Sequence, residues 1–558
     1  MSSSICHRCL KRALIPPSSS CFVPTTTAAF STSAALAANP TKKKAPVGKT
    51  LVKAGRTLRL TKNVRVQNTR PPAPGERKAS RKKVVLANPN ALEVVGLEDL
   101  TTANVGDLEK LKEMEGKVLG LGEDTVEALR ALEAFKAGQG WSLFRRPAAL
   151  VRRETVRLGF ALNAIKTKQK VTRRVLFGER GSGKSVLLLQ GLAMAYLRGH
   201  IVLHFPEARE IANAQTAYQP LRVTTEDGQY ETIYVQPHYT ARLLAAFARA
   251  NRGLLDSLQI LLPHPDVPIP LQSNLSLARL LDLGAQDPQL AYPIWRAFLA
   301  EITAPSQPER TGGLRPAVCV SMDGVDHIMR MSAYLDPDSR PIHAHSLAIA
   351  RDFVALLSGR TALPNGGVVL AATSVSTRPA VPTLDHFLAC AVAEAYTRPL
   401  RFVRRTLLAQ AKRKETVQDL ELSSLDDLPT GPAVLARLPA LVARQALRLE
   451  EVLTTFRDRP TVPSGALAMA LKQIVFELPA WSGFEAIDAP VAAVMESGVR
   501  VVRVGGLTKA EARGVMEYYA RSGMMRGSVT EGVVGERWTL AGGGVVGQIE
   551  KGVVRARF

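Results

Sequence analysis

Residues 175–189, VLFGERGSGKSVLLL, constrain the fold of this chain more than any other segment. Within them, GERGSGKS at residues 178–185 matches the pattern G-x-x-x-x-G-K-[ST] in full. The apolar run at residues 174–177 predicts a strand, and the apolar spacing of VLLLQGLAMAYLRG after the match predicts a helix. A glycine-rich turn between a strand and a helix presents backbone N–H groups and the helix N-terminus to phosphate oxygens. The segment therefore predicts a phosphate-binding loop that follows a strand.

The phosphate-binding loop carries two side chains with expected roles. Lys184 is expected to reach the β- and γ-phosphates of a nucleotide, and the Ser185 hydroxyl is expected to bind Mg²⁺. The whole loop forms the predicted nucleotide site, which consists of Gly178, Glu179, Arg180, Gly181, Ser182, Gly183, Lys184 and Ser185.

A second metal-binding residue is expected at the end of a neighbouring strand. Within residues 317–327, AVCVSMDGVDH, the apolar run predicts a buried strand that ends in Asp323. Asp323 is expected to hold a water molecule on Mg²⁺, as the second acid of such nucleotide sites does. The alternative is an aspartate that only caps the end of the strand. Thr373 and Ser374 end a further apolar run, at a position where polar sensor residues often lie.

The apolar runs alternate with helical patterns along the middle of the chain. Strands are predicted at residues 174–177, 200–206, 317–323 and 366–374. This order predicts an α/β fold in which a parallel sheet has helices on both faces, as in P-loop NTPases of the AAA+ and STAND type.

The residues around Asp323 favour binding of a nucleotide over its hydrolysis. Gly324 stands where many P-loop ATPases place a glutamate that orients the attacking water. Asp326 is a candidate substitute, because D-G-V-D resembles the D-[GAS]-x-D pattern of switch ATPases, but His327 follows it instead of another acid. The guanine-reading pattern N-K-x-D is absent, and the nearest approximation is TKAE at residues 508–511. We therefore expect at most slow hydrolysis, assign no catalytic residue and leave the base open.

The N-terminal 85 residues carry most of the positive charge. They contain 18 Lys and Arg and a single acidic residue, Glu76, in a chain with a formal net charge of +24. Residues 1–40, rich in Ser, Thr and Ala, predict a mitochondrial transit peptide; the alternative is a disordered N-terminus. Residues 41–90 predict a disordered basic extension. Its lysines and arginines suit contact with RNA phosphates, and the alternative is a solvated linker.

Further boundaries follow from shifts in composition. We expect a helical lead-in at 91–160, the P-loop domain at 161–380, a helical domain at 381–475 and a winged-helix-like module at 476–558. No apolar run is long enough to predict a membrane span. Cys6 and Cys9 resemble half of a metal site, but no second pair lies nearby and we expect no metal there.

Several segments together resemble one known family. They are WSLFRRPAALVR at residues 141–152, LFGERGSGKS, HIVLHFPEA, YVQPHYTARLL and AVCVSMDGVD. The chain resembles mitochondrial small-subunit ribosomal proteins of the death-associated protein family. The resemblance implies a protein of the mitochondrial matrix that binds GTP or GDP with Mg²⁺, ATP being the alternative. It also implies small-subunit rRNA and other mitoribosomal proteins as partners, and contact with the large subunit. Residues 178–185 and Asp323 would correspond to the family's nucleotide and Mg²⁺ site.

Two hypotheses about function remain. The first is a structural protein of the mitochondrial small ribosomal subunit that holds a purine nucleotide, hydrolyses it weakly or not at all, and contributes to mitochondrial translation. The second is a mitochondrial STAND- or AAA+-like ATPase switch that is not stably part of the ribosome. The first hypothesis accounts for the basic N-terminal region, whereas the second does not. Co-sedimentation with the small subunit distinguishes them.

Overall fold

The computed structural model describes residues 84–554, except 225–227, 273, 377–378, 413–439, 460, 482 and 484–485. All described residues belong to one structural unit, residues 81–558. The predicted transit peptide, the basic extension up to residue 83, and Cys6 and Cys9 lie outside the described residues, so their predictions stay untested.

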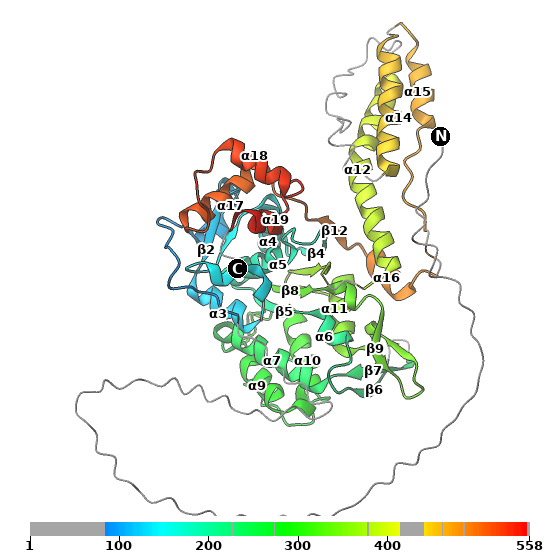
Figure 1. Cartoon of the computed structure of the whole chain (residues 1–558). Helices are drawn as coiled ribbons and strands as arrows, with labels where there is room; N and C mark the ends of the chain where they lie inside the picture. Colours follow the sequence, from blue (N-terminus) through cyan, green and yellow to red (C-terminus); the bar gives the residue numbers. More distant parts are fainter. Residues whose placement is uncertain are drawn as a thin grey trace, which may run out of the picture. The chain divides into compact units, whose positions relative to one another are not determined.

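A parallel sheet of five strands forms the centre of this unit (Figure 1). Its strands, in spatial order, are β12 (Arg500–Arg503), β4 (Val171–Phe177), β11 (Gly367–Ala372), β8 (Val318–Asp323) and β5 (Ile201–Phe205). Every residue of β8 and β11 is buried, as expected for inner parallel strands that are covered on both faces, and every residue of the edge strand β5 is buried as well. Four of the strands were predicted; β12 was not expected in this sheet.

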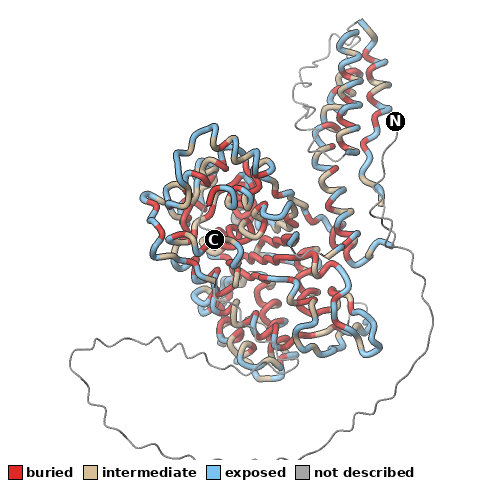
Figure 2. Tube along the Cα trace, viewed as in Figure 1, coloured by how far each residue is buried: buried red, intermediate tan, exposed pale blue. Residues whose placement is uncertain are grey.

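Helices cover both faces of the sheet. On β4 the side chain of Arg173 donates to Leu356 O of α11 (Ala348–Ser358), and the next residue, Arg174, reaches the backbone of α4 (Arg153–Lys168). Successive residues of a strand point to opposite faces, so α4 and α11 lie on opposite sides. Figure 2 shows the burial that results along the strands. The predicted α/β class, with a parallel sheet flanked by helices, is confirmed.

Other helices pack around this centre. They are α5 (Lys184–Leu197), α6 (Ala208–Ala212), α7 (Pro237–Ala250), α8 (Arg252–Leu255), α9 (Leu277–Gln286), α10 (Pro288–Thr303) and α16 (Ala489–Glu496). Two antiparallel pairs are added, β6 (Gln219–Thr224) with β7 (Tyr230–Val235), and β9 (Met331–Leu335) with β10 (Pro341–His343). Short 3-10 turns lie at η3 (Val325–His327) and η4 (Ala344–Ser346). Phe205 at the end of β5 packs edge-on against Phe247, Trp295 and Phe353, which joins α7, α10 and α11 to the sheet.

The N-terminal lead-in contains strands as well as the expected helices. Its elements are β1 (Asp99–Leu100), α1 (Thr102–Gly106), α2 (Leu108–Glu113), β2 (Val118–Leu121), α3 (Glu123–Ala131), η1 (Ala137–Gln139), η2 (Trp141–Leu143) and β3 (Ala148–Leu150). The three strands form a small sheet in the order β1-β2-β3. The lead-in expected to be helical changes to a strand here, because α2 ends at Glu113 and Gly116, with a φ of +87°, precedes β2.

Three long helices follow the core of the sheet. They are α12 (Pro382–Ala411), α14 (Ala440–Arg457) and α15 (Ser464–Gln473). Leu400, Leu449 and Leu467, one from each helix, are buried together in a separate hydrophobic cluster. None of the helices in the described part of the chain is long and apolar enough to cross a membrane.

The C-terminal residues differ from the predicted winged-helix-like module, which the structure does not confirm. Residues 500–503, which lie within the range predicted for that module, form β12 of the central sheet. The helices α17 (Lys509–Arg521), α18 (Glu531–Leu540) and α19 (Val546–Val553) follow, and no strand occurs among the described residues after Arg503. Gly542, Gly543 and Gly544 all have positive φ, so this run forms a turn between two helices and does not border a strand.

Candidate functional site

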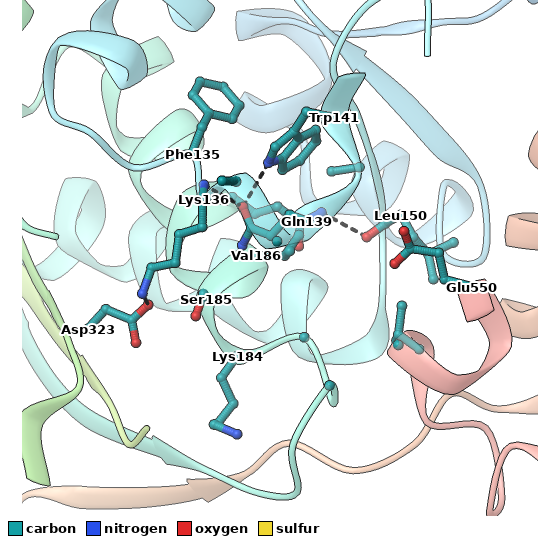
Figure 3. Close-up of a pocket in the computed structure, with 18 of the residues that line it drawn as sticks. Phe135, Lys136, Gln139, Trp141, Leu150, Lys184, Ser185, Val186, Asp323 and Glu550 are labelled. Atoms are coloured by element: carbon teal, nitrogen blue, oxygen red, sulfur yellow. Dashed lines mark hydrogen bonds and ion pairs between the residues drawn. The ribbon is translucent and has the colours of Figure 1, made fainter. Parts of the chain in front are cut away.

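A cavity of about 910 Å³ opens at the carboxyl ends of the central strands (Figure 3). The phosphate-binding loop contributes Arg180, Gly181, Gly183, Lys184 and Ser185, and the strand ends contribute Glu207, Asp323, Thr373 and Ser374. The lead-in and the C-terminal helices close the other sides with Phe135, Lys136, Gln139, Trp141, Arg152, Tyr518, Tyr519, Val546, Gly547 and Glu550. Ligands of open α/β sheets bind at this end of the strands.

The phosphate-binding loop has a backbone that only glycine adopts readily. Gly181 and Gly183 have φ values of +78° and +93°, and a Cβ on Gly178 would lie 2.2 Å from Val504 O. Lys184 begins α5 and is 7% exposed. Its Nζ donates to Gly178 O at 2.9 Å and to Glu179 O at 2.8 Å, so the ammonium lies within the curve of the loop.

Asp323 pairs with a lysine that the sequence did not indicate. The Asp323 carboxylate ends β8 and forms an ion pair with the Lys136 ammonium. Figure 3 shows Lys136 reaching from the lead-in to this carboxylate. Asp323 and the Ser185 hydroxyl both line the cavity and offer the oxygen ligands that Mg²⁺ prefers. The donor set therefore fits the metal, and a cation of the protein competes with it.

The backbone that carries Lys136 is held in place by its neighbours. The Gln139 side-chain oxygen accepts from Lys136 N at 2.9 Å and from Trp141 Nε1 at 2.8 Å. The ring of Phe135 meets Trp141 edge-on, with 5.2 Å between ring centroids. This turn therefore presents aromatic surface and an ammonium group to the same cavity.

The C-terminal helices are joined directly to the loop. Gly547 N, in the first turn of α19, donates to Gly181 O at 2.9 Å. The two backbones approach so closely that a Cβ on Gly547 would lie 3.2 Å from Gly181 Cα. The phosphate-binding loop is thus sandwiched between the sheet and α19.

Arg152 fastens the loop from the lead-in side. Its side chain is buried, and its Nη1 donates to Ser182 O at 2.6 Å while its Nη2 donates to Gly505 O at 2.9 Å. The guanidinium Nε lies 3.3 Å from the carboxylate of Glu154. One buried residue therefore ties the loop to the segment that follows β12.

The acidic residues divide into those that line the cavity and those that do not. Asp326, the suggested substitute for a glutamate, does not line it; its Oδ1 accepts from Ser374 N at 2.6 Å. Glu207 does line it and is exposed. It follows β5, and Ala208 N lies 4.0 Å from the position of a Cβ on Gly324, so Glu207 stands next to the end of β8.

His204 lies behind Asp323 in the core. Its Nδ1 is 2.7 Å from Ser321 Oγ on the neighbouring strand β8. Burial lowers the pKa of His204 to about 4, and the Asp323 carboxylate only partly offsets this effect. A neutral imidazole therefore lies behind the carboxylate, and Lys136 is the positive charge that pairs with it.

The structure brings most of the predicted site residues together. Five of the eight loop residues line this cavity together with Asp323, whereas Gly178, Glu179 and Ser182 do not line it. Sequence reasoning missed Lys136, Glu207 and Glu550. Glu207 directly follows β5, the strand next to the one that ends in Asp323, and this position could have marked it as a site residue. The sequence offered no comparable signal for Lys136 or Glu550.

Comparison with known proteins gives two matches. A family model described as mitochondrial ribosomal death-associated protein 3 matches residues 149–428 and 442–552. The small ribosomal subunit protein mS29 of Neurospora crassa is 35% identical over 565 residues, which cover 99% of this chain and 98% of that protein. The first match includes the phosphate-binding loop, Asp323 and α19, while Lys136 lies outside it.

Proposed function

Because the chain belongs to the family of mitochondrial ribosomal death-associated protein 3, we propose that its cavity binds a purine nucleotide within the small mitoribosomal subunit. The chain is a structural protein of that subunit and is located in the mitochondrial matrix as part of the mitoribosome. Other mitoribosomal proteins and small-subunit rRNA are its partners. Contact with the large subunit belongs to the proposal.

One observation carries the nucleotide part of the proposal. Asp323, from a distant part of the sequence, lines the same cavity as Lys184 and Ser185 of the glycine loop. Cationic, hydroxyl and carboxylate groups in this arrangement suit the phosphates of a nucleotide and its Mg²⁺. GTP or GDP is the favoured ligand because of the family resemblance, and ATP is the alternative.

Mg²⁺ would be held by the Ser185 hydroxyl and, directly or through water, by Asp323. The metal would neutralise phosphate charge when bound. We propose weak or no hydrolysis, because Gly324 occupies the usual glutamate position and Asp326 lies outside the cavity lining. Binding to the folded state alone would stabilise the chain by mass action. The nucleotide would then hold the lead-in, the sheet and the C-terminal helices together.

The proposal is tested by a lysine pair. Full-length protein with Lys184→Ala, and a matched control with Lys170→Ala, are purified, denatured and analysed for released nucleotide by anion-exchange chromatography. Lys170 is exposed and precedes β4, outside the cavity lining. We expect wild type and the control to release one guanine nucleotide per chain, and Lys184→Ala to release less than about a tenth of that. Wild-type occupancy in Lys184→Ala would contradict the assignment.

Sedimentation of mitochondrial extract at moderate salt tests the ribosomal part separately. We expect the protein to run with the small subunit in wild type. A protein that runs free near its monomer mass and still holds nucleotide would instead favour the ATPase-switch hypothesis.

A further inference from the structure

Three arginines come together on the face of the sheet that carries α4, away from the nucleotide cavity. Arg157 lies on α4, Arg174 on β4 and Arg500 on β12. Arg500 and Arg174 are direct partners in the parallel register of β12 and β4. Arg174 Nη1 donates to Arg157 O at 3.5 Å, which places the helix beside this pair. None of the three residues lines the cavity.

This cluster has no negative charge to balance it. No ion pair of Arg157, Arg174 or Arg500 occurs among the residues that the structure describes. Arg174 is half-buried, and its Nε is shielded from solvent without a hydrogen-bond acceptor. Buried donors in folded proteins nearly always have acceptors, so this group points to a missing partner.

The electrostatic environment agrees with that geometry. Burial lowers the pKa of Arg174, and the positive charges of Arg500 and Arg157 lower it further. By contrast, the pKa of Arg252 on α8 is raised, chiefly by its hydrogen bond to Asp282. An anion placed among the three guanidinium groups would relieve the repulsion and supply the absent acceptor.

An exposed aromatic ring lies next to the cluster. Phe160 is 48% exposed and stands three residues after Arg157, on the same side of α4. A large apolar ring beside unpaired guanidinium groups suits a base stacked on the ring and phosphates bound by the arginines. β12 is the last strand of the sheet and contacts α12, where Arg503 Nη1 donates to Tyr396 Oη at 3.4 Å. Arg157, Phe160 and Arg500 are themselves exposed. A flexible strand of nucleic acid can therefore approach.

We propose that Arg157, Arg174 and Arg500 bind the phosphate backbone of RNA and that Phe160 stacks on one of its bases. The site is separate from the nucleotide cavity and does not depend on it. A free phosphate ion would use the arginines but leave Phe160 without a role. An acidic protein surface is the alternative partner that the test must exclude.

The test measures the affinity of the full-length protein for a fluorescein-labelled single-stranded oligouridine of 40 nucleotides across a range of KCl concentrations. Arg157→Ala with Arg500→Ala removes two exposed guanidinium groups that would bind phosphates. We expect the slope of log affinity against log salt to become shallower by about 1.4, because each phosphate of single-stranded RNA that is no longer neutralised changes it by about 0.7. Phe160→Ala is expected to lower affinity about tenfold with the slope unchanged.

The matched control is Arg249→Ala with Arg279→Ala, which removes two exposed arginines on α7 and α9. It should leave the slope within about 0.3 of wild type, because neither arginine belongs to the cluster and every variant keeps the same N-terminal region. Circular dichroism checks that each variant is folded. Arg157 and Arg500 are chosen because their side chains are exposed, so their removal should have little effect on folding. The salt concentration that releases the protein from purified small subunits should fall for the cluster variant only. An RNA affinity and a slope that are unchanged in the cluster variant would overturn the proposal. If that variant also binds the small subunit less well, the partner of the cluster is an acidic protein surface.

Discussion

The ammonium of Lys136 forms an ion pair with the carboxylate of Asp323 in the lining of the cavity at the carboxyl ends of the strands. The Asp323 side chain is 5% exposed, whereas that of Lys136 is 38% exposed. The lysine comes from the turn before η1 and the aspartate from the end of β8, so the pair joins the lead-in to the sheet. Because Asp323 is also the proposed Mg²⁺ residue, Lys136 and the metal compete for one carboxylate.

Removal of Lys136 is expected to lower the Mg²⁺ concentration that nucleotide binding requires. In Lys136→Ala the carboxylate of Asp323 is free for the metal. The Mg²⁺ concentration that gives half-maximal binding of a fluorescent guanine nucleotide should fall about fivefold, the effect of about 1 kcal/mol for a partly exposed ion pair. A titration with Mg²⁺ at fixed nucleotide concentration measures this midpoint.

Lys112→Ala is the control, because this exposed lysine lies on α2 in the same lead-in. It should leave the midpoint unchanged. If Lys136→Ala also leaves it unchanged while nucleotide still binds, the competition is refuted. If neither variant nor wild type binds nucleotide, the proposed nucleotide function fails and the competition is no longer at issue.

Arg152 and Arg153 are adjacent arginines with opposite surroundings. Arg152→Met removes two hydrogen bonds to backbone oxygens of the loop and the following segment, and it leaves buried Glu154 without its nearest cation. We expect a loss of about 3–5 kcal/mol in the free energy of unfolding, measured by urea denaturation. Arg153→Met removes a side chain that is 55% exposed and should change stability by less than about 1 kcal/mol. Equal losses in both variants would show that Arg152 has no special role in holding the loop.

Gly547 and Gly552 offer a matched pair within α19. A Cβ on Gly552 meets no atom within 4 Å, so Gly552→Ala should stabilise the protein by about 0.5–1 kcal/mol through helix propensity. A Cβ on Gly547 would press on the backbone of Gly181 at 3.2 Å. Gly547→Ala should therefore gain no stability and should weaken nucleotide binding several-fold. Thermal unfolding and nucleotide titration measure the two effects, and equal nucleotide affinity in the two variants would contradict the contact between α19 and the loop.

The central strands could be predicted because each is a long apolar run beside a recognisable helix pattern. The strand before residues 178–185 and the helix after them could also be predicted, because both are local apolar patterns on either side of a glycine-rich turn. The place of β12 in this sheet could not be predicted, because a run of four residues, RVVR, carries no signal of which strand it pairs with. Only its pairing with β4 makes it a strand of the central sheet.

The walls of the cavity were not readable for a different reason. Lys136 and Glu550 belong to segments far apart in the sequence, and both face the loop only after the lead-in and α19 have packed on it. No periodic pattern in the local sequence indicates contacts of this kind. The turn at Gly542, Gly543 and Gly544 was ambiguous for a local reason, since glycine runs border strands and also join helices.

Acid is expected to destabilise the fold through His204. This residue is 3% exposed, and its pKa lies near 4 because burial disfavours the charged imidazole. In the unfolded chain the histidine pKa is about 6.5, so between these values the unfolded state binds more protons and stability rises with pH. The contribution of His204 is fully present above pH 6.5 and is lost as pH falls towards 4, about 3 kcal/mol in all. His204→Gln should flatten the decline of unfolding free energy over this window, whereas His238→Gln, at an exposed position on α7, should not. Urea denaturation between about pH 4.5 and pH 7.5, which covers most of this window and the plateau above it, measures the slope. An identical slope in wild type and His204→Gln would refute the assignment.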